Sequence, residues 1–368
     1  MIYLDYQATT ALAPEVAAAM IAAMDHYGNP NSAHRIGRIA AADVELARER
    51  IMDAMGKRDG RLIFTSGATE ALNLAIVGAA RNSAPERRRV VTLATEHHAV
   101  LDTVLALRHE GFEPVILPVG SDGLVDLDIA EAAIDGRAAL LAVMQVNNEI
   151  GVRQPIDALI DIARASDVAV VCDAVQGFGK YAAPDADLVA VTAHKMHGPK
   201  GVGALWLRAG IDLPQLMHGG GQEGGIRPGT LSPMLCAGFG VAAQIAAERR
   251  VADLDHVETL WGHALHLFAD WQLNGAADAR YHGNLNVRHA GLDASRLMSD
   301  VRTVALSLGS ACASGSGRPS HVLKAIGLTD GEARGSLRMG FGRYTTIAEL
   351  DEAAALINAA VALQKAAA

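Results

Sequence analysis

Two polar clusters follow apolar runs near the middle of the chain and could do chemistry together. The run 168–172 ends in Asp173, and the run 188–191 is followed within four positions by Lys195. Two buried parallel strands would present such residues at the edge of the sheet where open α/β sheets bind ligands. There a lysine can form a Schiff base with pyridoxal phosphate, and an aspartate can keep its pyridine nitrogen protonated. A structural ion pair at the rim of the sheet explains the two residues equally well.

The segment 65–71, Thr-Ser-Gly-Ala-Thr-Glu-Ala, follows an expected strand and opens an expected helix. Its small residues leave backbone N–H groups accessible at the start of the helix, where an anion such as phosphate is favoured. Thr69 would add a hydroxyl. Ser or Thr followed by Glu is also a capping-box pattern, so an ordinary helix start is an alternative interpretation.

Three further polar residues lie near expected strand ends. His97 is placed to stack on a flat ring and to move protons near neutral pH. Asn148 could donate a hydrogen bond to a phenolate oxygen or a substrate carboxylate, and Gln176 could donate to the ring oxygen. A structural histidine and an asparagine favoured by turn geometry are the alternatives. No zinc-ligand spacing accompanies His97, and we expect no metal.

Two glycine-rich segments carry charged or reactive residues. In 218–230, HGGGQEGGIRPGT, Arg227 and Thr230 suit contacts with anions, although composition alone favours a linker. In 308–317, LGSACASGSG, Cys312 lacks apolar surroundings. Most free cysteines are buried and unreactive, so this setting favours a nucleophile.

Composition limits the class of protein. A chain of 368 residues predicts roughly two domains. The formal net charge of −9 argues against non-specific binding to nucleic acid or to an anionic membrane. The first residues lack the features of a secretion signal, and the apolar stretches are too short to cross a bilayer. Three cysteines without close pairing indicate a reducing compartment, and we expect the cytoplasm.

The pattern of apolar runs positions these motifs in an α/β fold. Strands and helices alternate up to about residue 250, which predicts a mostly parallel, seven-stranded sheet with helices on both faces. The expected strands are 61–65, 90–94, 113–117, 140–144, 168–172, 188–191 and 202–207. Beyond it, a helix at about 251–271, short strands at 284–288, 305–308 and 336–340, and a final helix at 347–363 predict a smaller α+β domain. We therefore expect a large cofactor-binding domain at 12–250 and a small domain from 1–11, which we expect to be irregular, and 251–368.

The motifs, taken in order, resemble those of the cysteine desulfurases, pyridoxal-phosphate enzymes of the class V aminotransferase group and of fold type I. The similarity is greatest to the subgroup that serves iron–sulfur cluster and nitrogenase assembly. It extends nearly end to end, through LDYQATT (4–10), YGNPNSAH (27–34), FTSGATEALNLA (64–75), TEHHAVLDT (95–103), VNNEIG (146–151), DAVQ (173–176), HKMHGPKGVGAL (194–205), GGGQEGGIRPGT (219–230), GSACASGS (309–316) and SLRMGFGRYTT (336–346).

The resemblance implies roles for the matching residues. Lys195 would bind the cofactor covalently, Asp173 its pyridine nitrogen and Gln176 its ring oxygen, while His97 would stack on the ring and transfer protons. Asn148 would lie near the ring oxygen and the substrate; Ala68, Thr69, Thr192 and His194 would hold the phosphate, and Thr230 would reach it from the other subunit of a homodimer. Arg338 would bind the substrate carboxylate, and Cys312 would become a persulfide.

The implied reaction converts L-cysteine to L-alanine and passes the sulfur to an acceptor protein, such as a cluster scaffold or a sulfur carrier. A selenocysteine lyase, an aminotransferase of the same fold and an inactive sulfur-relay protein are the alternatives. Three residues depart from the family pattern: Thr192 replaces a serine, Gly224 an arginine and Leu308 a small serine.

Overall fold

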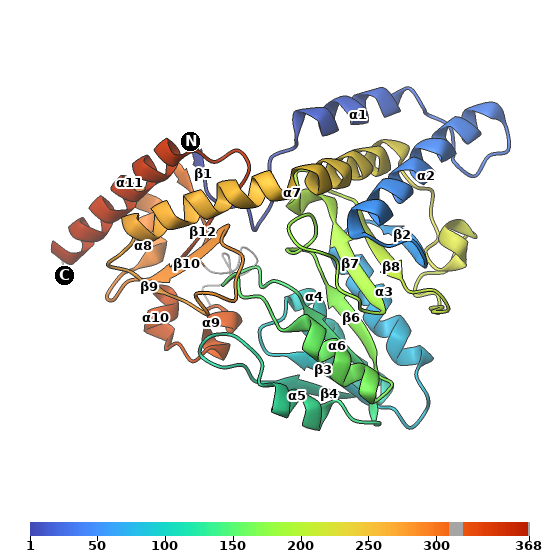
Figure 1. Cartoon of the computed structure of the whole chain (residues 1–368), viewed down its shortest axis with the longest axis horizontal. Coiled ribbons are helices and arrows are strands. Elements are labelled where there is room, and N and C mark those ends of the chain that lie inside the picture. Colours follow the sequence, from blue (N-terminus) through green and yellow to red (C-terminus); the bar gives the residue numbers. More distant parts are fainter. Residues whose placement is uncertain (309–318, 367–368) are drawn as a thin grey trace.

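The computed structural model describes residues 1–308 and 319–366. Its larger part is built on a seven-stranded sheet (Figure 1). The strands lie in the order β2 (Arg61–Thr65), β8 (Gly203–Leu207), β7 (Leu188–Thr192), β6 (Ala169–Asp173), β5 (Ala138–Met144), β3 (Arg89–Leu93) and β4 (Glu113–Leu117). β8 is antiparallel to both neighbours and all other pairs are parallel. The predicted mostly parallel α/β sheet is confirmed.

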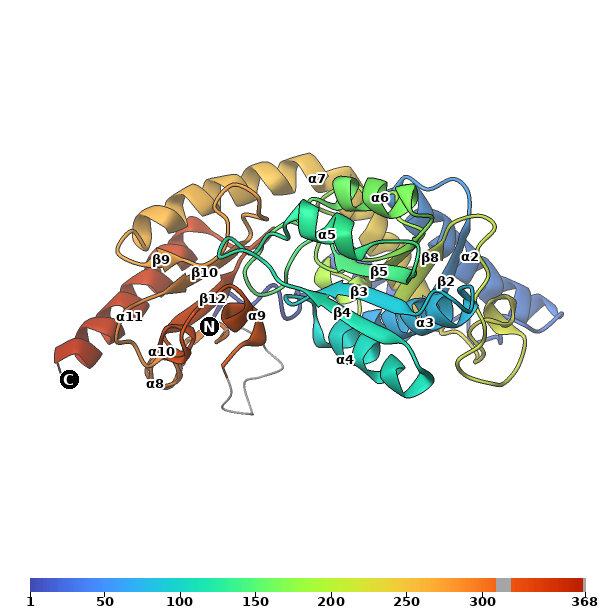
Figure 2. The ribbon, with the colours of Figure 1, turned by 90° about the horizontal axis from the view of Figure 1, so that it is seen from below.

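Helices cover both faces of this sheet (Figure 2). Apolar side chains on the two faces form separate clusters. One face packs against α2 (Arg35–Met55), α5 (Leu127–Ala133), α6 (Ile156–Ala165) and the first half of α7 (Pro233–Leu267). The other packs against α3 (Ala68–Asn82) and α4 (His98–Ala106), which the 3-10 turn η1 (Leu107–Glu110) extends. Every residue of β5 is buried, because helices cover both faces of the sheet. Its sequence, AALLAVM, is therefore apolar throughout and does not alternate between apolar and polar residues.

The helix α7 differs most from its prediction. It begins at Pro233, well before the expected start near residue 251, and runs for 35 residues. Ser232 caps it by accepting from the N–H of Leu235 at 3.4 Å, and proline suits a first helical turn. Its first half is Ala- and Gly-rich and is buried against α2, so it lacks the amphipathic period by which a surface helix is recognised.

The smaller part has its own apolar core. Its antiparallel sheet has the order β12 (Ser336–Gly340), β10 (Asn284–Arg288) and β9 (Gln272–Leu273). The remaining helices are α8 (Ala294–Asp300), α9 (His321–Ala325), α10 (Asp330–Arg334) and α11 (Ile347–Ala366). The helix α7 contributes Leu260 and Ala264 to this core after supplying Phe239 to the large one. The domain boundary at residue 250 stays a prediction, and it falls inside this continuous helix.

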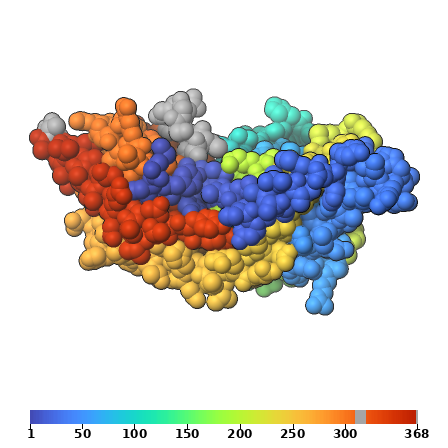
Figure 3. All heavy atoms as spheres, turned by 90° about the horizontal axis from the view of Figure 1, so that it is seen from above, coloured from blue at the N-terminus to red at the C-terminus, as the bar shows by residue number. Residues whose placement is uncertain are grey.

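The first residues are more regular than predicted. The strand β1 (Ile2–Tyr3) pairs in parallel with β11 (Val304–Ala305), which is shorter than the expected strand 305–308. Figure 3 shows the N-terminal residues in dark blue, lying across one face beside the red C-terminal part. α1 (Pro14–Met24) follows and packs on α7. Within the described ranges, no helix is long and apolar enough to span a bilayer.

Candidate active site

The carboxyl ends of β5, β6 and β7 open into one large cavity of about 630 Å³. Ten of the twelve residues predicted for the site line it: Ala68, Thr69, His97, Asn148, Asp173, Gln176, Thr192, His194, Lys195 and Arg338. Thr230, which the structure describes, does not line the cavity of its own chain. Cys312 lies outside the described residues. Side chains up to 270 positions apart in sequence therefore share one cavity.

Asp173 and Lys195 come from neighbouring parallel strands. Asp173 ends β6, and Lys195 ends the 3-10 turn η2 (Ala193–Lys195) directly after β7. Burial raises the pKa of Asp173 to about 6, while a 2.9 Å hydrogen bond from the N–H of Val175 and the charge of Lys195 oppose this. The carboxyl is therefore still mostly ionised at pH 7 and can hold a protonated ring nitrogen.

The start of α3 lines the cavity and is suited to bind an anion. Its N-cap, Gly67, supplies no side-chain hydrogen bond, so the N–H groups of the first turn remain available to an anion. Glu70 accepts from the N–H of Ser66 at 2.6 Å and pairs with Arg227 at 2.7 Å. The anionic group that Arg227 contacts is thus the carboxylate of Glu70 in the same chain. This ion pair connects the glycine-rich segment 218–230 to the start of α3.

His97 is the N-cap of α4. Its Nδ1 accepts from the N–H of Ala99 at 3.0 Å, which in the neutral imidazole leaves the proton on Nε2. Burial lowers the pKa of His97 to about 4, and the charge of Lys195 adds to this. Near neutral pH, His97 is therefore an uncharged ring that donates from Nε2.

Arg338, in β12, lies at the other end of the cavity and is 1% exposed. Its Nη2 donates to Oδ1 of Asp5 at 2.7 Å, and its Nη1 donates to the carbonyl of Asn148 at 3.0 Å. A buried guanidinium held in this way has a fixed orientation and suits a carboxylate ligand.

The N-terminal segment 5–10 contributes contacts that sequence reasoning missed. The carbonyl of Gln7 accepts from Lys195 Nζ and, at 2.9 Å, from Gln176 Nε2. Ala8 also accepts from Lys195, at 2.7 Å. The motif LDYQATT is part of the resemblance, but its backbone carbonyls have no sequence signature, because every residue carries one.

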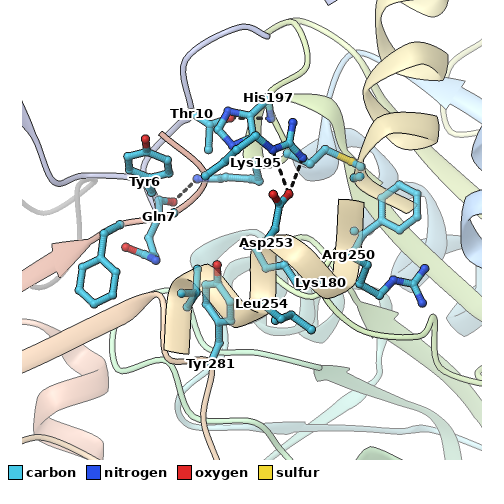
Figure 4. Close-up of a pocket in the computed structure, with 18 residues that line it drawn as sticks. Tyr6, Gln7, Thr10, Lys180, Lys195, His197, Arg250, Asp253, Leu254 and Tyr281 are labelled. Carbon is cyan, nitrogen blue, oxygen red and sulfur yellow. Dashed lines mark hydrogen bonds and ion pairs between the residues drawn. The ribbon is translucent and has the colours of Figure 1, made fainter. Parts of the chain in front are cut away.

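A second, smaller cavity of about 50 Å³ lies next to Lys195 and Gln7, which line both cavities (Figure 4). Lys180 lines it and donates to the carbonyl of Gln176 at 2.8 Å. Burial lowers the pKa of Lys180 to about 7, and the charge of Lys195 adds to this. Arg343 and Asp253 also line this cavity, and Arg343 Nη2 and Asp253 form an ion pair at 2.7 Å.

The structure gives a physical reason for one departure from the family pattern. Gly224 lies in a left-handed stretch, with φ +63° between φ +50° at Glu223 and φ +83° at Gly225. A Cβ at this position would also lie 2.7 Å from Nη1 of Arg61. Glycine suits that backbone. Leu308, another departure, packs against the core of the smaller part.

Comparison with known proteins shows the family of the chain. Residues 2–352 match the model of the class-V aminotransferase family. The chain belongs to the class-V aminotransferases. Within this family its relatives include a cysteine desulfurase of Vibrio cholerae (43% identical, covering 98% of this chain and 92% of the relative) and one of Rickettsia akari (41%, 97% and 90%). The mitochondrial cysteine desulfurase of Drosophila melanogaster is 41% identical, over 95% of this chain and 78% of the relative.

The fold of this class-V aminotransferase is also similar to the folds of solved structures. A NifS-like protein superposes with a TM-score of 0.92 at 31% identity, over 98% of this chain and 99% of the other. DndA from Streptomyces lividans gives a TM-score of 0.78 at 33% identity, over 91% and 98%. Enzymes of this family depend on pyridoxal phosphate, and the residues present fit that cofactor: an uncapped helix start, a buried aspartate and a lysine line one cavity.

Proposed function

We propose that the chain is a pyridoxal-phosphate-dependent cysteine desulfurase that converts L-cysteine to L-alanine and transfers the sulfur to Cys312. One observation carries this proposal. A lysine, a buried aspartate, an uncapped helix start and an arginine suited to carboxylates line the same cavity, and these are the kinds of group that a cofactor ring, its phosphate and an amino acid require. The cysteine desulfurase relatives at 40–43% identity support the choice of reaction.

Lys195, Asp173 and His97 would each have a separate role in the reaction. When bound, pyridoxal phosphate supplies an electron sink for the carbanion at the substrate α-carbon. Lys195 would bind the cofactor covalently, and after the substrate displaces it, its amine would take the α-proton. Asp173 would hold the ring nitrogen in its protonated form. His97, with its proton on Nε2, would stack on the ring and donate toward the substrate.

Other residues that line the cavity would bind the phosphate, the ring oxygen and the substrate carboxylate. Ala68, Thr69, Thr192 and His194, which line the cavity, would hold the phosphate, while Gln176 and Asn148 would approach the ring oxygen. Asn148 and Arg338 would hold the substrate carboxylate. The thiolate of Cys312 would attack the substrate sulfur and form a persulfide, while the electron pair of the broken C–S bond stays on the substrate β-carbon, which takes up a proton to become the methyl group of L-alanine.

We place this activity in a cytoplasmic homodimer that passes its sulfur to an acceptor protein for iron–sulfur cluster or other cofactor synthesis. Two observations support the dimer. Ile21, Met24 and Tyr27 are exposed on and just after α1, and a second copy would cover such apolar side chains. Thr230 lies outside the cavity of its own chain, which leaves it available to a partner's phosphate site.

The test is product analysis with the purified chain and pyridoxal phosphate. With L-cysteine and a thiol, we expect sulfide and L-alanine in equal amounts, and no product from Lys195→Ala. Strong turnover of L-selenocysteine with none of L-cysteine would favour a lyase. Amino transfer to a 2-oxo acid, without sulfide, would favour an aminotransferase. No reaction with any of the three would leave a sulfur-relay protein and overturn the proposal.

A further inference from the structure

Arg338 already has an acidic partner in this chain. Its Nη2 donates to Oδ1 of Asp5 at 2.7 Å, and the side chain of Asp5 is 18% exposed. The same Oδ1 accepts from the hydroxyl of Ser307 at 2.9 Å. Asp5 therefore places a negative charge next to the guanidinium that a substrate carboxylate must approach.

Arg338 keeps donors for a ligand while it holds Asp5. A guanidinium has five N–H donors, of which the structure uses one on Nη2, for Asp5, and one on Nη1, for the carbonyl of Asn148. Its buried Nε has no hydrogen-bond partner among the described residues. A carboxylate in the cavity can therefore bind Arg338 without displacing Asp5, and two carboxylates then share one guanidinium.

The other acidic group near Arg338 is Glu149, which also lines the cavity. Burial raises the pKa of Glu149, and its hydrogen bond from Ser320 only partly opposes this. Glu149 is thus less readily ionised than an ordinary glutamate. The charges of His321 and His98 also act against this rise of the Glu149 pKa. Asp5 is the acidic group in direct contact with the guanidinium.

We propose that Asp5 sets the affinity of the site for carboxylates: as the counter-ion of Arg338 it weakens binding of the substrate and product carboxylate, and so favours release of L-alanine. The proposal rests on the proposed function, because it takes Arg338 as the group that holds the amino-acid carboxylate. Asp5 acts through Arg338 and is a positioning residue.

Asp5 has two opposing effects on the affinity for a carboxylate: its charge repels the ligand, and its hydrogen bond fixes Arg338 in place. The larger of the two effects determines whether Asp5 weakens or strengthens binding. Repulsion between two carboxylates about 6 Å apart, at an effective dielectric constant of about 20, corresponds to roughly a hundred-fold weaker binding. Fixing the arginine side chain favours binding by roughly ten-fold. In Asp5→Asn the charge is lost, but Oδ1 can still accept from both Arg338 and Ser307, since both bonds use this one oxygen.

The test uses two matched ligands on the full chain loaded with pyridoxal phosphate. L-Alanine carries a carboxylate, and ethylamine is the same amine without it. The dissociation constants come from titrations followed by the visible spectrum of the cofactor. In Asp5→Asn we expect L-alanine to bind about ten-fold more tightly or better and ethylamine to bind as in wild type.

The matched control is Asp253→Asn, which removes the charge from another arginine–aspartate pair, with Arg343, outside the large cavity. It should leave L-alanine binding unchanged. Asp5→Ser, with a shorter oxygen acceptor, replaces Asp5→Asn if that variant does not fold. Unchanged or weaker L-alanine binding, or an equal change for ethylamine, overturns the inference. A wild type that responds to neither L-cysteine nor L-alanine contradicts the proposed function instead.

Discussion

At the scale of single residues, burial determines which form each polar group takes. Asp173 stays mostly ionised at pH 7 although burial raises its pKa, because a backbone N–H and Lys195 face it. His97 is uncharged because burial and Lys195 act in the same direction. The cavity thus combines a carboxylate, which can accept a hydrogen bond from a protonated ring nitrogen, with a neutral imidazole, which can donate one from Nε2.

The role proposed for Cys312 can be separated from that of the cofactor. In Cys312→Ser, L-cysteine should still change the visible spectrum of the bound cofactor, because this needs Lys195 and the ring alone. Sulfide release with a thiol should be lost, since a serine hydroxyl cannot take the sulfur. Cys236→Ser, at a buried cysteine in α7, is the control and should keep its activity. Full activity in Cys312→Ser would assign the sulfur transfer to another group.

The low pKa of His97 predicts a change of stability with pH. The folded pKa is about 4 and the unfolded value 6.5, so the unfolded state binds more protons in this range and acid destabilises the fold. Relative to His97→Gln, wild type should lose about 2 kcal/mol of unfolding free energy between pH 7 and pH 5. Urea unfolding at both pH values measures this, with the exposed His109→Gln as control. A pH-independent difference would show that His97 titrates normally.

At the scale of elements, close backbone packing holds α7 against α2. A Cβ at Gly240, in α7, would lie 2.6 Å from the Cα of Ala47, in α2, so glycine is needed for this approach. Gly262, in the same helix, has nothing within 4 Å of its Cβ position. The helix therefore offers one glycine required by packing and one that is not.

These two glycines give a matched pair of substitutions. Gly240→Ala should lower the free energy of unfolding by about 1–3 kcal/mol, because the added methyl group must push two helix backbones apart. Gly262→Ala should raise it by about 0.5–1 kcal/mol, because alanine favours the helix. Thermal or urea unfolding measures both. Equal effects at the two positions would mean that the contact with Ala47 does not constrain α7.

At the scale of the whole molecule, the site combines side chains from the larger and the smaller part of the structure. Asp173 and Lys195 follow strands of the large sheet, while Arg338 lies in the small one. The segment 5–10 contacts both groups, through Asp5 with Arg338 and through Gln7 with Lys195. The proposed substrate-binding and cofactor-binding residues are therefore linked by one short segment of the chain.

The proposed homodimer predicts complementation between two defective chains. Thr230→Ala should bind pyridoxal phosphate more weakly, because each site loses a hydroxyl from its partner, and Lys195→Ala should be inactive. A mixed dimer of the two has one site with both residues intact. Mixing after partial unfolding and refolding should therefore restore sulfide release beyond that of either variant. If mixed dimers form but the mixture releases no more sulfide than the two variants do separately, Thr230 does not belong to the partner's site.

Local patterns in the sequence predict the sheet and the positions of most strands, because apolar runs that end in polar residues mark the ligand edge of a parallel sheet, and small residues mark a helix start. The same patterns indicate six of the ten residues that share the cavity: Thr69, His97, Asn148, Asp173, Gln176 and Lys195. The other four, Ala68, Thr192, His194 and Arg338, are implied by the family resemblance. The tertiary structure alone decided the start of α7, the pairing of β1 with β11, and the contacts of Asp5 and Gln7 with Arg338 and Lys195. Such features depend on which distant backbone or carboxylate lies opposite a residue, and no local pattern of residue types specifies that partner.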